Sequence, residues 1–300
     1  MSLDGNPGRT TVAVRDSAFY HRREMDSATL QAPPSAHEDM DDGIAVVVLT
    51  HNRVDLLRKC VENVLMGTSP LTREILIWDN ASTDGTAEYL KSLEDPRVRI
   101  VLNEHNIGQN GYARAFRMTT SPYLVELDDD VVEAPREWDA TLLAAFKRLP
   151  KIGFLAADLV DDPNDRASYV RYNVHQYTLV EENGVRLLRG PAGGGCAITS
   201  RELSDRVGGF RESKKHIFWL EDETYIKDIE KIGYECAVLA DLKVHHTGGP
   251  YYSTIPHEKT KYWQQRESAH ARRQAIKRVL VRFPFVRRLN AHYHWFEAPS

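Results

Sequence analysis

Three adjacent aspartates, Asp128, Asp129 and Asp130, have the residue type and spacing that suit a divalent metal ion. They directly follow residues 123–127, an apolar run that predicts a buried strand. Neighbouring carboxylates repel one another, and Mg²⁺ or Mn²⁺ prefers oxygen ligands and bridges to phosphate groups. A solvated acidic loop is the alternative, but the position at a strand end favours a metal site.

Polar residues also follow the two preceding apolar runs. Thr50 and Asn52 lie at the end of the first, and Asp79 ends the second. In open α/β sheets, ligands bind at the carboxyl ends of the strands, so these residues are expected to line one crevice with the aspartates. The Asp79 carboxylate could accept a hydrogen bond from the imide N–H of a uracil or thymine ring. The alternative is that Asp79 only forms a turn.

Three further clusters carry weaker signals. The segment from Asn106 through Gly108 to Arg114 combines glycines, which allow close backbone approach, with a guanidinium that fits a diphosphate. Glu221 and Asp222 open a predicted helix, where carboxylates often serve only the helix dipole. Strand alternation directs one imidazole of the pair His245-His246 toward the site, where it would add a third metal ligand.

The predicted elements that position these residues alternate between strand and helix up to residue 150. This alternation predicts βαβ units and a parallel sheet. The expected strands are 44–50, 74–79, 98–102 and 123–127, and the expected helices follow Asn52 and cover 86–93 and 112–118. Beyond residue 150 we expect a strand at 152–159, paired strands 178–180 and 185–188 around Asn183-Gly184, a helix at 223–231, and short strands at 236–240 and 242–246.

The two ends of the chain differ from this central part. Residues 1–42 are polar, end in an acidic cluster and predict a flexible or loosely packed extension. Residues 251–300 predict a basic helical segment, in which Lys and Arg outnumber acids ten to one between positions 259 and 288. A solvated helical face is the simplest interpretation of those charges. Contact with anionic lipid or with a diphosphate is the alternative.

Composition narrows the function classes. A net charge of −4 over 300 residues argues against a nucleic-acid binder. The three cysteines are far apart, which argues against a disulfide scaffold or a cysteine zinc site and fits a reducing cytosol. No apolar run approaches the roughly 18 residues of a membrane span, and no signal peptide is apparent. We therefore expect a cytoplasmic protein, with peripheral contact of 259–288 at the inner membrane face as an alternative.

The order of these motifs is more specific than any one of them. VVVLTHNR, IWDNASTDGT, NxGxxGxAR, LDDDV, a glycine-rich segment with VGGF, WLEDE and VHHTGG together resemble the family 2 glycosyltransferases over about residues 43–250. The resemblance implies a Rossmann-like α/β fold of the GT-A type with a mostly parallel central sheet. It implies a nucleotide-binding half at 43–150 and an acceptor-binding half at 151–250. The implied reaction is inverting sugar transfer from a nucleoside diphosphate sugar, with Mn²⁺ or Mg²⁺.

The resemblance also implies roles for individual residues. Asp222 matches the catalytic base, and the implied metal ligands are Asp128, Asp130 and His246, with His245 as the fallback. The acceptor side is Gly194, Gly195, Trp219 and Glu221. The nucleotide-sugar side is Thr50, Asn52, Arg53, Asp79, Asn106, Gly108, Arg114, Asp128 and Asp129.

Two departures from the family pattern bear on the substrate and the base. The segment 190–196 is richer in glycine than the aromatic-led version common in the family, which leaves the acceptor open among glycans, lipid-linked molecules and small molecules. Thr224 stands where the family often has Asp. Asp79 favours UDP or dTDP as the donor nucleotide.

Two rival functions are a nucleotidyltransferase and a catalytically silent sugar-nucleotide-binding protein. The first usually begins with a glycine-rich phosphate loop, which residues 44–58 lack. The presence of both Asp130 and Asp222 argues against the second.

Overall fold

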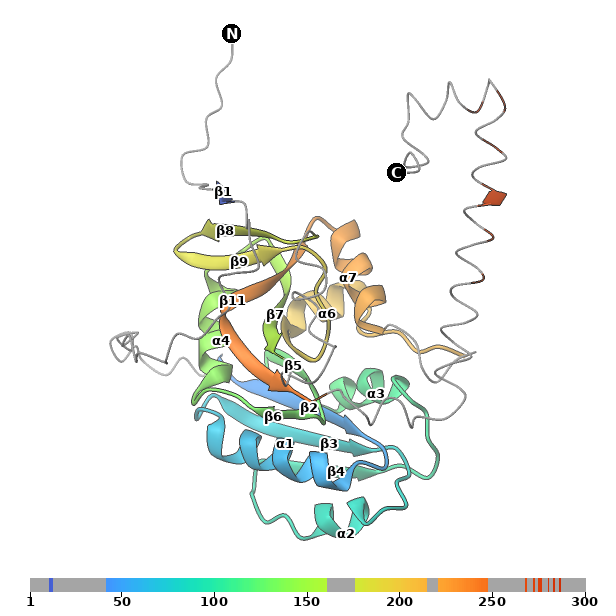
Figure 1. Cartoon of the computed structure of the whole chain (residues 1–300). Helices are drawn as coiled ribbons and strands as arrows, with labels where there is room; N and C mark the ends of the chain where they lie inside the picture. Colours follow the sequence, from blue (N-terminus) through green and yellow to red (C-terminus); the bar gives the residue numbers. More distant parts are fainter. Residues whose placement is uncertain are drawn as a thin grey trace. The chain divides into compact units, whose positions relative to one another are not determined.

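A computed structural model describes residues 42–160, 176–214 and 221–247, the pair Thr11 and Val12, and seven isolated positions between 268 and 286 (Figure 1). The chain separates into two compact units, Met1–Tyr252 and Ser253–Ser300. Within the described part of the chain, no helix is long and apolar enough to cross a membrane. The predictions for 1–42 and 251–300 fall almost wholly outside the described residues and stay predictions.

The described residues of the first unit form one mixed sheet of eleven strands. Four neighbouring parallel strands form one side, in the order β5 (Tyr123–Asp128), β2 (Ile44–Thr50), β3 (Thr72–Asp79) and β4 (Val98–Leu102). These are the four strands that the sequence predicts before residue 150, and their parallel pairing confirms the expected α/β class. Their carboxyl ends therefore meet at one edge, as a ligand-binding crevice of this architecture requires.

The other side of the sheet contains the antiparallel pairings. Strand β10 (Cys196–Ser200) lies between β5 and β7 (Ile152–Val160) and is antiparallel to both. Strand β11 (Glu235–His246) runs parallel to β7 and pairs with the short β6 (Val131–Glu133) and with β9 (Val185–Arg189). Strand β9 forms the predicted hairpin with β8 (Thr178–Glu182), and β1 (Thr11–Val12) pairs with β8.

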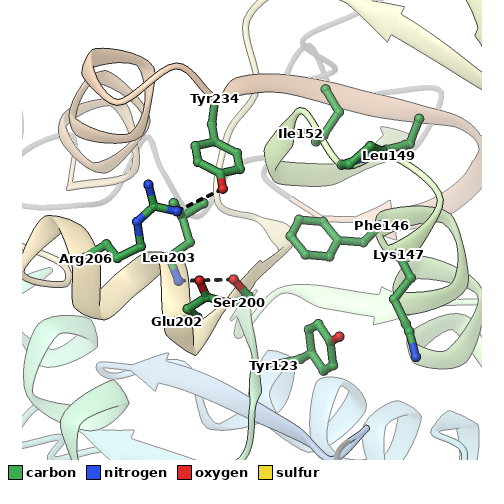
Figure 2. Close-up of a pocket in the computed structure, with 11 residues that line it drawn as sticks. Tyr123, Phe146, Lys147, Leu149, Ile152, Ser200, Glu202, Leu203, Arg206 and Tyr234 are labelled. Atoms are coloured by element: carbon green, nitrogen blue, oxygen red, sulfur yellow. Dashed lines mark hydrogen bonds between the residues drawn. The ribbon is translucent and has the colours of Figure 1, made fainter.

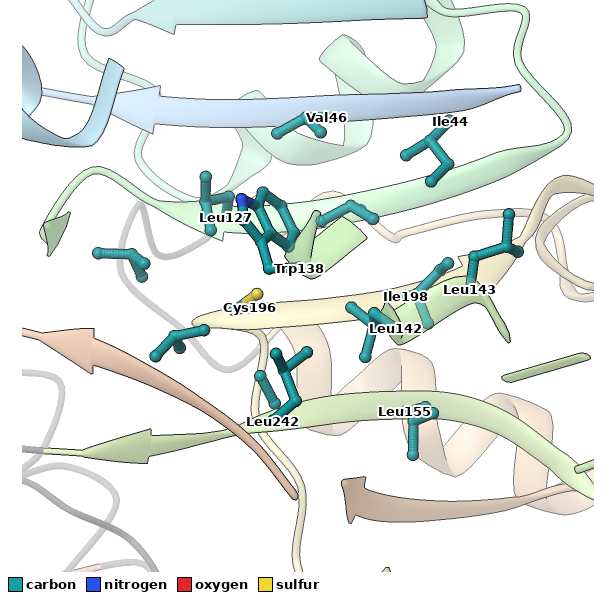
Figure 3. Close-up of a cluster of buried hydrophobic side chains, with 14 of the residues drawn as sticks. Ile44, Val46, Leu127, Trp138, Leu142, Leu143, Leu155, Cys196, Ile198 and Leu242 are labelled. Atoms are coloured by element: carbon teal, nitrogen blue, oxygen red, sulfur yellow. The ribbon is translucent and has the colours of Figure 1, made fainter. Parts of the chain in front are cut away.

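Helices cover both faces of the sheet. Helices α1 (Val54–Gly67), α2 (Thr86–Lys91) and α4 (Trp138–Lys147) contribute to one apolar core with β2, β5 and β10, shown in part in Figure 3. Helices α3 (Asn110–Met118), α6 (Arg201–Val207) and α7 (Glu221–Lys231) contribute to the core on the opposite face. Successive residues of β2 alternate between these two cores, because side chains alternate across a strand. The central strands are therefore buried on both faces, which explains their nearly continuous apolar sequence.

The structure corrects one prediction for the second half. Residues 236–246 form part of one continuous strand, not two short ones, and its register against β7 shifts between Leu239 and Lys243. The polar residue Asp241 lies within this irregular stretch, and its side chain accepts a hydrogen bond from Arg186 at the surface. A bulge of this kind lets a strand keep pairing while it bends, so the apparent break in the apolar pattern is a distortion and not an end.

A surface pocket of about 320 Å³ lies away from the carboxyl ends of the parallel strands (Figure 2). Tyr123 and Ile152, at the first residues of β5 and β7, contribute to its lining, as does Ser200 at the end of the antiparallel β10. Arg206 donates a hydrogen bond to the Tyr234 hydroxyl at 3.0 Å at its rim. The pocket is thus at the opposite end of the strands from Asp128, and it takes no part in the site described below.

The packing of α3 on the sheet gives a stability prediction. A methyl group at Gly111 would lie 2.3 Å from Leu49 Cδ1 and 3.2 Å from Trp78 Cδ1. We expect Gly111→Ala to lower the free energy of unfolding by about 1–3 kcal/mol through overpacking, measured by urea denaturation. Gly111→Ala combined with Leu49→Ala should cost less than the sum of the two separate substitutions, because the smaller side chain removes the closest clashing group. Strictly additive effects of the two substitutions would contradict this packing.

Candidate active site

The aspartate triplet lies where β5 ends. Asp128 is the last residue of the strand, and Asp129 and Asp130 form the turn into β6. Asp129 is 4% exposed and Asp130 is fully buried. Three carboxylates held this close in a buried turn need positive partners, because an unpaired buried charge is costly. The alternative of a solvated acidic loop is therefore wrong for Asp129 and Asp130.

His246 is one of these partners, and strand pairing brings it there. It ends β11 opposite Val131, and the next residue, Thr247, donates its backbone N–H to the Asp130 carbonyl oxygen at 2.8 Å. The His246 Nε2 atom lies 2.9 Å from Asp130 Oδ1 and 3.4 Å from Asp128 Oδ2. The structure thus places His246 beside the aspartates. His245 of β11 stands opposite Glu133 of β6 in the strand register.

Asp128, Asp130 and His246 have the geometry of a metal site. One ligand atom from each lies within 4.8 Å of the other two. Burial lowers the pKa of His246, but hydrogen bonds and charge from Asp128 and Asp130 outweigh it and raise the pKa to about 10. Burial raises the pKa of Asp128, and His246 more than reverses this, so the net shift is downward. Two carboxylates and an imidazole form a donor set that fits a divalent ion such as Mn²⁺.

Asp129 is directed elsewhere, toward the end of β2. Its carboxylate accepts hydrogen bonds from the Thr50 hydroxyl at 2.7 Å and from Arg53 Nη1 at 2.7 Å. Arg53 Nη1 also lies 3.1 Å from Asp130 Oδ2. Burial raises the pKa of Asp129 to about 6, against the lowering effect of Arg53. Thr50 and Arg53, predicted to line the nucleotide pocket, thus contact the aspartates and brace the turn, and their contact with a nucleotide stays a prediction.

The ends of β2 and β3 are tied together by short polar contacts. The Asp79 carboxylate is buried and accepts the backbone N–H of Ser82 at 3.1 Å, which is the contact of a turn former. The Asn52 side-chain oxygen accepts the N–H of Thr83 at 2.7 Å. Asn52 has a φ of 53°, a left-handed conformation that Asn tolerates better than most residues. The base-binding role of Asp79 stays a prediction.

The loop before α3 is joined to the same edge. Asn80, at the end of β3, donates to the Gly108 carbonyl oxygen at 3.1 Å, and Asn106 accepts the Gly108 N–H at 2.8 Å. Arg114 is engaged differently: its Nε and Nη2 atoms donate to the Glu212 carboxylate at 3.1 and 3.0 Å. The structure therefore brings Asn106 and Gly108 to the crevice edge and gives Arg114 a carboxylate partner in place of a phosphate.

Asp222 is brought to the metal cluster by two glycines. The Gly194 N–H donates to Asp222 Oδ2 at 3.0 Å, and the Gly195 carbonyl oxygen accepts the backbone N–H of Asp128 at 2.9 Å. Adjacent residues of one segment thus contact the predicted base and the predicted metal ligand. Burial raises the pKa of Asp222, and the Asp128 charge adds to this, while two backbone N–H groups oppose it. A carboxylate with a raised pKa is a better proton acceptor.

Glu126 is a buried residue of this region that the sequence analysis missed. Glu126 lies in the middle of β5, two residues before Asp128 on the same strand face, and is 2% exposed. Glu221, expected on the acceptor side, is 6% exposed, and its carboxyl group is close enough to that of Glu126 for each to affect the pKa of the other. Burial is the main cause that raises the pKa of both. An acidic residue inside an apolar strand is the signal that could have identified Glu126.

Tyr112 supports the end of β5 from α3. Its hydroxyl group is 3.0 Å from the Leu127 carbonyl oxygen and 3.3 Å from Asp128 Oδ1, and its side chain is almost fully buried. Trp219, predicted on the acceptor side, lies outside the described residues. The cluster as described combines a metal-capable triad, a neighbouring carboxylate of raised pKa and a crevice at the carboxyl ends of parallel strands. Such a combination suits a metal-assisted displacement at a phosphorylated substrate.

Comparison with known families agrees with this arrangement. The family model described as glycosyl transferase family 2 matches residues 45–208, more than half of the chain. The chain belongs to this family. The family expected from the motif order is confirmed.

Two curated relatives have low sequence identity to this chain. The chain is 23% identical over 240 residues to the uncharacterized protein y4gI of Sinorhizobium fredii, covering 73% of this chain and 26% of the relative. It is 27% identical over 103 residues to the succinoglycan biosynthesis protein ExoO of Rhizobium meliloti, covering 34% and 29% respectively. The chain thus spans about a quarter of the length of these relatives.

Solved structures confirm the GT-A fold of this glycosyltransferase. The mannosyltransferase PcManGT of Pyrobaculum calidifontis, in complex with GDP-Man and Mn²⁺, matches with a TM-score of 0.51 and 23% identity, over 70% of this chain and 59% of that one. TarS of S. aureus, in complex with UDP-GlcNAc, matches with a TM-score of 0.54 and 15% identity, over 72% and 62%. At this level of identity the likeness shows only the fold. The substrate and the roles of individual residues must be argued from this chain itself.

Proposed function

We propose that this glycosyltransferase moves a sugar from a nucleoside diphosphate sugar to an acceptor hydroxyl group, with a divalent metal and with inversion at the anomeric carbon. The observation that supports this most is the contact of Gly194 and Gly195 with Asp222 and Asp128. It sets a proton acceptor beside a metal-capable triad, so that an acceptor hydroxyl and a donor diphosphate can be held next to each other.

Asp222 acts as the general base. Its carboxylate takes the proton of the acceptor hydroxyl as that oxygen forms a bond to the anomeric carbon, and the bond from that carbon to the diphosphate oxygen breaks. One displacement of this kind inverts the anomeric centre. Asp128, Asp130 and His246 would hold the metal ion, which when bound stabilises the negative charge of the departing diphosphate. Thr50 and Arg53 keep the aspartate turn in place through Asp129.

The donor nucleotide that we favour is UDP or dTDP. Asp79 lies at the carboxyl end of β3, and an ionised carboxylate accepts further hydrogen bonds beyond the one from Ser82. The imide N–H of uracil or thymine would supply one. PcManGT was solved with GDP-Man and TarS with UDP-GlcNAc, so the fold itself accommodates more than one base. Mn²⁺ is favoured over Mg²⁺ because the triad includes an imidazole nitrogen.

A thermal-shift panel tests the donor site. UDP, dTDP, GDP and CMP are each added with Mn²⁺, with Mg²⁺ or with EDTA. A nucleotide at about 100 times its dissociation constant stabilises the native state by about 2.7 kcal/mol. We expect UDP or dTDP with Mn²⁺ to raise the unfolding midpoint by roughly 5–10 °C and EDTA to abolish the shift. Stabilisation by GDP in preference to UDP would contradict the role of Asp79, and no shift with any nucleotide would contradict the donor site.

A further inference from the structure

Glu126 is a buried acid with no place in the transfer mechanism given above. It lies on β5 among apolar residues, and among the described residues its Oε2 atom has no hydrogen-bond partner. Burying a carboxyl group in this way costs stability. Its contacts converge on the neighbours of Asp222, which are Gly194 on one side and Glu221 on the other.

The contact with Gly194 is close. A Cβ atom built on Gly194 would lie 2.4–2.5 Å from the carboxyl atoms of Glu126, so the Glu126 carboxyl group fills the place where a side chain would stand. The same glycine donates its N–H to Asp222 Oδ2 at 3.0 Å. The Gly194 backbone is therefore packed between the two acids, and a shift of Glu126 changes the direction of the hydrogen bond that Asp222 accepts.

The second contact reaches Asp222 through the chain. Glu221 directly precedes Asp222 at the start of α7, and its buried carboxyl group is close enough to that of Glu126 for each to affect the pKa of the other. The first turn of α7 is thereby fixed to β5, the strand that also carries Asp128. The base and the metal-binding strand are held to one another by this link and by the Gly194–Gly195 segment.

We propose that Glu126 is a positioning residue for the transfer reaction, and that its carboxyl group holds the Asp222 carboxylate in place through Gly194 and Glu221. The inference rests on the proposed function of Asp222. Its consequence is specific: loss of the Glu126 side chain misplaces the base and leaves the donor site unchanged. A shift of a catalytic group by about 1 Å costs on the order of a hundredfold in rate.

The test compares Glu126→Ala with Glu126→Gln in the full chain. Release of UDP from UDP-glucose, UDP-galactose and UDP-N-acetylglucosamine is measured with Mn²⁺, with water as the acceptor, and the fastest donor is used. We expect Glu126→Ala to lower kcat by roughly 10- to 100-fold with an unchanged KM for the donor. Glu126→Gln keeps the shape of the side chain and its packing against Gly194, so it should restore kcat to within about threefold.

Asp139→Ala is the matched control. Asp139 is also a fully buried acid, but it accepts hydrogen bonds from Ser69 and Thr72 and is not among the contacts of Asp222. Its loss should lower the unfolding midpoint without changing kcat below that midpoint. If Glu126→Ala behaves like this control, or if Glu126→Gln is as slow as Glu126→Ala, the positioning role is wrong.

A structural measurement gives a second test that does not depend on turnover. In a crystal structure of the Glu126→Ala protein, we expect the distance from Gly194 N to Asp222 Oδ2 to exceed 3.5 Å; an unchanged 3.0 Å contact overturns the proposal. Asp222→Asn, assayed in parallel, separates the two levels of inference. Full activity of that variant removes the proposed base. Loss of its activity together with a normal Glu126→Ala enzyme removes only the role of Glu126.

Discussion

Replacement of Asp222 by Asn is expected to lower kcat by about 10²- to 10⁴-fold, the usual contribution of a general base. The amide has the same shape but cannot take a proton from the acceptor. Gly194 and Glu223 donate their N–H groups to different oxygens of Asp222, so the single amide oxygen of Asn can accept only one of them, and the shape of the side chain should retain the fold around it. The measurement is UDP release from the best UDP-sugar, at saturating donor and Mn²⁺.

Donor binding provides the control for this variant. Asp222 is not part of the metal-capable triad, so the midpoint shift given by UDP and Mn²⁺ should match that of the unchanged protein. The pair of results, lost turnover with normal binding, would assign a role in the chemical step. A turnover within threefold of the original would contradict the assignment of the base.

The second large effect is expected at the metal triad. Asp130→Asn and His246→Ala should each abolish the Mn²⁺-dependent part of the nucleotide midpoint shift, because each removes one of three ligands. Asp130 is fully buried between His246 and Arg53, so no solvent-exposed carboxylate can take its place as a metal ligand. The shift is measured with UDP at a fixed concentration while Mn²⁺ is titrated.

His245→Ala is the matched control for this experiment. It removes an imidazole from the neighbouring position of the same strand, but the described triad contains His246. We expect the Mn²⁺ titration of this variant to resemble that of the unchanged protein. A lost shift in His245→Ala together with a normal one in His246→Ala would reverse the assignment made from strand pairing.

Much of the fold before residue 130 could be predicted from local patterns. The strands that end at Thr50, Asp79 and Asp128 are buried on both faces, so each appears as an apolar run closed by a polar residue. The β8–β9 hairpin carries its own turn signal in Asn183-Gly184, both with positive φ. These signals come from residues that are close together in the sequence, so they can be recognised without knowing the tertiary contacts.

The remaining parts depend on contacts between distant residues. The insertion of β10 between β5 and β7 in antiparallel direction is a matter of pairing, which no local pattern specifies. The resemblance favours His246 over His245, and the register of β11 against β6 supplies the structural reason that His246 lies beside the aspartates. Helices α4 and α6 and strand β6 were not assigned at all. The uniformly apolar part of α4, around Leu142 and Phe146, lacks the polar face that identifies an amphipathic helix.

The candidate site divides in the same way. Asp79 and Asp128 end strands and Asp130 follows one closely, so the sequence could propose them, and it could propose Asp222 because the motif order resembles a family. Glu126 and Tyr112 could not, because their importance arises from what they contact across the sheet. Arg114 donates to Glu212, and its predicted contact with a diphosphate stays a prediction.

The most direct test of the metal centre is an anomalous diffraction experiment on crystals grown with Mn²⁺ and UDP. The account predicts one strong manganese peak within coordination distance of Asp130 and His246, with the diphosphate of UDP against the same ion. A peak elsewhere, or UDP bound in the crevice with no manganese at Asp130 and His246, would contradict the assignment of this triad as the metal centre of the enzyme.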